Sequence, residues 1–215
     1  MKKNDRLFAL TMVLFTVFLV VPFTHHWFFN TTGDYPIIGG FVKFFLFASI
    51  GDVLSNRLVK RSYRVNGLFK KAIVWGFIGM VIALVFPLFY HGVAYLQSNN
   101  LLPFDSSAFA LALFVSVFMN LIFAPTMMLF HRVTDAYIEN ITTKHFKTFN
   151  DILKSIDYEG FITFVVFKTI PFFWIPAHTI TFLLPETYRV FFASLLGVAL
   201  GLLLGIGKLR KKEES

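Results

Sequence analysis

The sequence predicts an all-α fold: a polytopic membrane helix bundle of about six transmembrane helices with proline-kinked spans. The chain is 56% hydrophobic and 15% charged, which leaves too few polar groups to cover a soluble domain of this size. Helices that cross a bilayer need about 20 apolar residues, and six stretches approach this length: 7–23, 36–56, 72–95, 108–130, 161–184 and 190–207. The length fits a single integral-membrane domain over residues 1–215.

Lysine and arginine occupy alternate gaps between these stretches. They occur before the first, after the second, after the fourth and after the sixth stretch, whereas the gaps 24–35 and 97–107 have none. Positive loops stay cytoplasmic during insertion, so both termini are expected in the cytoplasm. The net charge of +8 is then explained by anionic lipids on the cytoplasmic face rather than by nucleic acid.

The first two stretches differ in polarity. Stretch 7–23 has no ionisable group and is followed by His25, His26 and Trp27. The two histidines lack a third metal ligand nearby, so anchoring at the interface is favoured over metal binding. Stretch 36–56 begins at a proline, which costs no hydrogen bond there, and it contains Lys43 and Asp52.

The third and fourth stretches each carry a proline inside the apolar run. Pro87 precedes His91, and Asn120 precedes Pro125. Such prolines kink a helix and free carbonyl groups that need other partners in lipid. The polar segment 133–160 has apolar residues at helical spacing, and it is either an amphipathic surface helix or a solvated loop.

The fifth stretch combines Lys168, Pro171, Pro176 and His178. Two prolines five residues apart predict a bent or partly unwound span. Irregular backbone at membrane depth is tolerated only inside protein or beside water, so we expect this span to be shielded from lipid.

The sixth stretch carries Ala193, Gly197, Gly201 and Gly205 at i, i+4 spacing. Small residues at this spacing let two helix backbones approach closely. This face is expected to pack against the fifth span or against another subunit in a homo-oligomer.

Ionisable and amide side chains within membrane spans are costly, and they commonly face a partner or a cavity. The pore or buried polar candidates are Asp52, Asn120, Lys168, His178, Arg189, Lys43 and His91. Asp52 and Lys168 fall at a similar depth and are predicted to pair. The alternatives are another inner-side cation such as Arg57 as the partner of Asp52, and snorkelling of the lysine. His91 and His178 lack a third ligand, so no metal site is expected.

Three segments resemble a known family. They are Gly51-Asp52-x-x-x-Asn56, the stretch from Met119-Asn120 to Pro125, and Leu184-Pro185-x-x-x-Arg189. In order and spacing over about residues 40–207 they are similar to the Mpv-seventeen/peroxisomal membrane protein twenty-two family, although several motif positions differ. The resemblance implies a small multi-spanning protein of a bacterial cytoplasmic membrane, or of an organelle in a eukaryote, and some members are described as pore-forming.

The sequence contains no catalytic or nucleotide-binding signature. There is no His-Glu-x-x-His, Gly-x-Ser-x-Gly or Walker motif, and cysteine is absent, so neither an enzyme nor a cofactor is expected. We therefore expect a channel-like or transport protein for a small solute, with a non-transporting scaffold or stress-related assembly protein as the alternative. A polar lane past Asp52, Asn120 and Lys168 favours transport, and a dry Phe-filled centre favours the scaffold.

Overall fold

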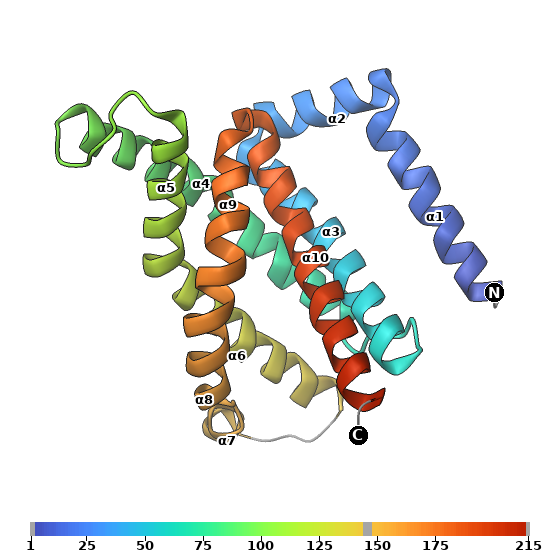
Figure 1. Ribbon diagram of the computed structural model, residues 1–215. Coiled ribbons are helices and arrows are strands. Elements are labelled where there is room, and N and C mark those ends of the chain that lie inside the picture. Colours follow the sequence, from blue (N-terminus) through green and yellow to red (C-terminus); the bar gives the residue numbers. More distant parts are fainter. Residues whose placement is uncertain (1–2, 144–147, 214–215) are drawn as a thin grey trace.

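The computed structural model describes residues 3–143 and 148–213, with side-chain surroundings for 4–143 and 148–203. Within these ranges every regular element is a helix (Figure 1), which confirms the all-α class. The helices are α1 (Lys3–Val20), α2 (Pro22–Asp34), α3 (Pro36–Lys60), α4 (Leu68–Ser98), α5 (Ala108–Ile122), α6 (Ala124–Thr142), α7 (Phe149–Lys154), α8 (Tyr158–Gly160), η1 (Phe161–Trp174), α9 (Ile175–Leu183) and α10 (Glu186–Glu213).

Four helical runs are long and apolar enough to cross a membrane: α3, α4, the run Tyr158–Leu183, and the Glu186–Leu203 part of α10. Two further pairs pass the same test together but are bent, α1–α2 by 78° and α5–α6 by 45°. Each predicted stretch therefore coincides with one run or one bent pair. The described part of the chain holds four spans, or up to six when each bent pair counts as one.

Prolines cause both bends. Pro22 occupies the start of α2, and Pro125 lies in the first turn of α6. Proline lacks the N–H that would continue the preceding helix, and it fits the first turn of a new one. The predicted kink at Pro125 is confirmed, whereas the first span ends at Val20 and α2 turns across the upper end of the bundle in Figure 1.

Helices α3 and α4 cross at two glycines. A Cβ added to Gly79 would lie 2.2 Å from the carbonyl oxygen of Gly40, and one added to Gly40 would lie 2.4 Å from that of Gly79. This reciprocal contact brings the two backbones together, as small residues do between membrane helices. The core extends from here through Phe86, Val115 and Met119 to Phe182 of α9.

The fifth span corrects the sequence prediction. It is one continuous helical run in which η1 is a π-helix and α9 is an ordinary α-helix. Few of its side chains are buried inside the bundle, and Phe167 and Phe172 are 67% and 81% exposed, so the expected shielding from lipid is wrong. The wider π-helical ladder has i→i+5 hydrogen bonds, and the hydroxyl of Thr169 donates to the carbonyl of Phe164 at 3.1 Å. The carbonyl of Ile175 in the same span accepts a hydrogen bond from the hydroxyl of Ser116 on the neighbouring helix α5, at 2.7 Å.

The described part of segment 133–160 is mainly helical, as the helical alternative predicts. Residues up to Thr142 continue α6, and the short helix α7 buries Ile152, which is 2% exposed. The loop 61–67 and α7 lie at the same end of the bundle, which we call the lower end from its place in Figure 1. Asn56 stabilises that loop by donating to the carbonyls of Ser62 and Arg64 at 2.9 and 2.8 Å.

Helix α1 is tied to α3 at this lower end. Asp5 accepts hydrogen bonds from Nε of Arg57 and from the hydroxyl of Tyr63, at 2.9 and 2.8 Å. The rings of Phe15 and Phe47 add an aromatic contact further along, with centroids 5.3 Å apart. The outer face of α1 remains apolar and exposed, as expected for a helix against lipid.

Candidate functional site

An apolar chamber of about 400 Å³ lies inside the bundle, between α4, the α5–α6 pair, the η1–α9 run and α10. This volume falls within the range of ligand pockets. Its walls are aromatic and aliphatic, with few polar atoms: Phe44, Trp75, Ile82, Phe86, Met119, Phe123, Ala124, Met127, Met128, Phe161, Phe164, Val165, Thr169, Trp174, Ala193, Gly197, Leu200 and Gly201, together with His131, Arg132, Asp135 and His178.

The chamber exists because two neighbouring helices separate. α9 packs against α10, but η1 continues the same span downwards and, in the described residues, none of its Cα atoms lies within 8 Å of a Cα atom of α10. Figure 1 shows the two runs diverging towards the lower end. Phe164 of η1 and Leu200 of α10 both line the chamber, and Phe164 is also exposed at the surface of the bundle. The chamber therefore opens sideways between η1 and α10, in the lower half of the bundle.

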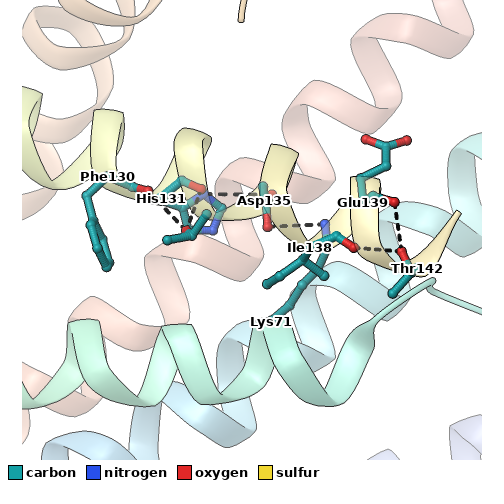
Figure 2. A network of polar contacts seen from close by, with 8 residues as sticks. Lys71, Phe130, His131, Asp135, Ile138, Glu139 and Thr142 are labelled. Atoms are coloured by element: carbon teal, nitrogen blue, oxygen red, sulfur yellow. Dashed lines mark hydrogen bonds and ion pairs between the residues drawn. The ribbon is translucent and has the colours of Figure 1, made fainter. Parts of the chain in front are cut away.

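A polar pocket of about 480 Å³ adjoins the chamber at the lower end. Arg132 and Asp135 line both spaces. Figure 2 shows the network at this junction, where Nζ of Lys71 lies 3.2 Å from Oδ1 of Asp135. Nδ1 of His131 lies 3.8 Å from Oδ2 of the same carboxylate. Asp135 is thus held between α4 and its own helix α6.

Arg132 is placed differently from Lys71. Its guanidinium donates to the backbone carbonyl of Asp157 and lies over the ring of Phe161, 5.5 Å from the centroid. In the described part of the chain it forms no ion pair with a carboxylate, whereas Lys71 does. A charged group with five N–H donors therefore sits at the mouth between the apolar and the polar space.

His178 closes the other end of the chamber. Its Nδ1 lies 3.0 Å from Nδ2 and 3.2 Å from Oδ1 of Asn120. Asn120 Nδ2 donates to the carbonyl of Ser116 at 2.8 Å, and the hydroxyl of Ser116 donates to the carbonyl of Ile175 at 2.7 Å. These buried bonds join α5 to α9 just where the prolines alter the helix.

Two indole N–H groups in the chamber walls have no hydrogen-bond partner in the described residues. They are Nε1 of Trp75 and Nε1 of Trp174, and both atoms are buried. Trp174 stacks on His178 with ring centroids 5.3 Å apart, and Trp75 lies against His131 at 4.2 Å. Buried donors without acceptors are uncommon in folded proteins. Neighbouring protein atoms cover both nitrogens, and the indole of Trp75 lies near Asp52, outside the chamber.

The predicted pair of Asp52 and Lys168 is wrong. Lys168 lies on the exposed side of η1, because the π-helical winding turns it away from the bundle. The cation that acts on Asp52 is Lys71 of α4, and Asp135 lies close enough to oppose it. Asp52 also lies near the indole of Trp75, although the two form no hydrogen bond of standard geometry. Asp52 is therefore an outlying member of the network in Figure 2.

The remaining polar candidates lie outside the chamber. Lys43 is 3% exposed and reaches the rings of Phe28 and Phe29 of α2, at 6.0 and 5.6 Å. Arg189 donates from Nε to the carbonyl of Leu184 and lies 4.2 Å from the ring centroid of Tyr90. His91 is on the exposed face of α4. Of the seven candidates, the structure brings together only Asn120 and His178.

The small residues of α10 differ in how closely they are packed. Ala193 belongs to the core, whereas a Cβ at Gly197 would meet nothing within 4 Å. Gly201 is loosely packed, since its Cβ would lie 3.8 Å from its nearest neighbours on α3. The close approach of α3 and α10 comes instead from Gly51, whose Cβ would lie 3.1 Å from Cα of Val198. Gly205 is in α10, but its surroundings lie outside the described residues.

The residues at the chamber mouth do not stand out in the sequence. Arg132 and His131 come at the end of the fourth stretch, and Asp135 lies in the polar segment after it. One signal was available: His131 and Asp135 are four residues apart and face the same side of a helix. His25 was missed in a similar way, and its Nε2 lies 3.2 Å from the hydroxyl of Tyr188 on α10.

No cluster of three or more metal-ligating side chains occurs in the ranges that the structure describes. Comparisons of the chain with protein-family models, with curated proteins and with solved structures found no significant match.

Proposed function

We propose that this membrane protein is a transport protein that binds a membrane-soluble solute in the apolar chamber and passes it through the bundle. The observation that carries the proposal is the chamber itself, which opens sideways to the surroundings of the helices and adjoins a polar pocket at the lower end. A bundle that served only as a scaffold would gain stability by filling such a space.

The nature of the walls argues against a hydrated ion or sugar as the solute. The polar lane expected past Asp52, Asn120 and Lys168 is not formed, because Lys168 faces outwards and Asn120 lies behind His178. The centre is an open space with apolar walls rather than a Phe-filled core, so neither criterion drawn from the sequence is met. An apolar or amphiphilic molecule would match the walls and replace lipid contacts at little cost.

The orientation of the protein in the membrane and its family relationship are part of the same proposal. The lower end carries the basic loop 61–67 and is assigned to the cytoplasm. The family resemblance is kept as a proposal, and the structure gives two of its motif residues structural roles. Gly51 allows the approach of α10, and Asn56 stabilises the loop 61–67.

The test is passage of a labelled amphiphile across sealed liposomes. Lysophosphatidylcholine and lysophosphatidylglycerol with an NBD group on the acyl chain are bleached by external dithionite only in the outer leaflet. Protein-containing liposomes should show faster bleaching of the inner-leaflet label than empty ones. Gly197→Phe should abolish the gain, because the ring enters the chamber. Gly92→Phe is the matched control, since Gly92 also has open space around its Cβ but lies outside the chamber. Equal bleaching with and without protein would leave the scaffold interpretation.

A further inference from the structure

We infer that the chamber binds a single-chain amphiphile with an anionic head, whose chain occupies the apolar space and whose head is held by Arg132. The inference rests on the proposed function for its site and adds the chemical class of the solute. The head is a carboxylate or a phosphate, and the chain is an unbranched hydrocarbon.

The charges at the chamber mouth favour an anion over a cation. The carboxylate of Asp135 is engaged by Lys71 and His131. Oδ1 of Asp157 accepts from the backbone N–H of Gly160 at 2.8 Å. Glu139 also lines the polar pocket, but Figure 2 shows its carboxylate pointing away from Lys71 and α4. Arg132 is the charged group that lines both spaces and forms no ion pair in the described residues.

Arginine suits this position for two reasons. Its planar guanidinium binds carboxylate and phosphate oxygens through two parallel hydrogen bonds, and its weaker hydration makes it easier to desolvate than a lysine ammonium. The bond to the carbonyl of Asp157 and the contact with Phe161 use only part of the group. The remaining N–H donors have no hydrogen-bond acceptor in the described residues, so they can bind a head from the polar pocket.

The route of entry favours a chain-bearing solute over a free anion. The backbones of η1 and α10 diverge towards the lower end of the bundle (Figure 1), and the space around the Cβ position of Gly197 is open. An acyl chain already in the bilayer meets this opening sideways. Its head then lies at the same depth as the junction of the two spaces, at the lower end.

Tryptophan fluorescence provides a direct test of binding. The chain has three tryptophans, of which Trp75 and Trp174 line the chamber and Trp27 is 58% exposed on α2. In a Trp27→Phe background in zwitterionic nanodiscs, a dibrominated stearic acid should quench the two chamber indoles saturably. A variant with Trp75→Phe and Trp174→Phe keeps only Trp27. Its quenching measures the brominated acid that is dissolved in the bilayer rather than bound in the chamber. Equally steep quenching in both proteins would overturn the site.

The charge requirement is tested by the head group and by Arg132. The methyl ester of the same dibrominated chain should bind about tenfold more weakly than the acid, as expected for loss of one hydrogen-bonded charge pair. Arg132→Gln should weaken the acid by about the same factor and leave the ester unchanged. Arg132→Lys should keep the preference for the acid with reduced affinity. Arg64→Gln, in an exposed part of the loop 61–67, is the matched control and should match the parent. Equal affinity of acid and ester, or an equal loss for both in Arg132→Gln, would overturn the anionic head.

Competition experiments distinguish a carboxylate head from a phosphate head. Together with the liposome assay they also separate this inference from the proposed transport function. Unlabelled stearate and a single-chain alkyl phosphate should each displace the brominated acid, and the stronger competitor identifies the head. Inorganic phosphate should not displace it, and displacement would refute the need for a chain. Saturable binding without passage in the liposome assay refutes transport alone. Passage without any preference for the acid refutes the anionic head alone.

Discussion

The hydrogen bond between Asn120 and His178 should contribute measurably to the stability of the bundle. Asn120 is 0% exposed and His178 is 8% exposed, and they come from α5 and α9. Asn120→Ala removes the amide that binds Nδ1 of His178 and the bonds to Ser116. The imidazole then stays buried with Nδ1 unpartnered, stacked on Trp174.

The size of the effect follows from the hydrogen bonds that this substitution removes. Hydrogen bonds between membrane helices average about 0.6 kcal/mol in double-mutant cycles, with a maximum near 1.7 kcal/mol. An unsatisfied buried partner adds about 1–3 kcal/mol. Asn120→Ala should therefore lower the free energy of unfolding by roughly 2–3 kcal/mol. His178→Ala removes the group that would be left unpartnered, so the double variant should lose less than the sum of the two single losses.

Reversible unfolding in bicelles of mixed lipid and SDS would measure this coupling. The four proteins of the cycle should give a coupling energy of about 0.6–1.7 kcal/mol. Asn99→Ala is the control, because Asn99 is exposed and bonds only to its own turn. Additive losses in the cycle would refute the argument, since they would mean that the amide and the imidazole do not stabilise each other.

Three further outcomes are expected. Gly79→Ala should destabilise the protein by about 1–3 kcal/mol through overpacking, whereas Gly92→Ala, with nothing near its Cβ, should not; comparable melting temperatures for the two would contradict the crossing of α3 and α4. Asp5→Asn should cost about 1–3 kcal/mol, because Asp5 accepts hydrogen bonds from Arg57 and Tyr63 in a half-buried ion pair, and an unchanged melting temperature would show that this pair does not hold α1. In this cysteine-free chain, Ser98→Cys and Ser155→Cys should react with an impermeant maleimide from opposite sides of the membrane, and labelling from one side would exclude the proposed orientation.

The spans were predictable because the bilayer imposes a simple rule. A helix that crosses it must be apolar over its whole length, and the six stretches coincide with the helical runs of the structure. The bend at Pro125 was also predictable, because proline removes a backbone donor whatever its surroundings. The 78° turn at Pro22 was not predictable. Apolar residues continue through the turn, and hydropathy does not show in which direction a helix runs.

The fifth span shows where local reasoning failed. Pro171 and Pro176 were expected to leave carbonyls that only buried surroundings satisfy. The backbone continues through Pro171 as a π-helix instead of unwinding, and the hydroxyl of Ser116 on α5 donates to the carbonyl of Ile175. Its apolar side chains then face outwards, and Lys168 is turned away from Asp52. The prediction assumed the 3.6-residue period of an α-helix. In a π-helix the period is longer, so the side chains point in other directions.

The site was predictable only in part. The predicted residues lie in the middle of an apolar stretch, whereas the missed residues lie at or beyond its end. Asn120 and His178 stand out because amide and imidazole groups in the middle of an apolar stretch need partners. Arg132 and Asp135 stand at the end of a stretch, where charged residues are ordinary. Their role depends on α6 continuing as a helix beyond the apolar run and facing Lys71, which hydropathy does not report.

The small residues of α10 are the most instructive case, because the same pattern supports opposite structures. Where the neighbouring helix runs alongside, a glycine lets two backbones touch, as Gly51 does with Val198. Where the neighbour diverges, as η1 does from α10, a glycine leaves open space, as at Gly197. The path of the neighbour decides between packing and a chamber, and that path follows from the change of helix type between η1 and α9. A side chain added at Gly197 therefore tests occupancy of the chamber: it displaces no existing contact, so lost binding or passage in a fully stable variant can come only from the space it fills.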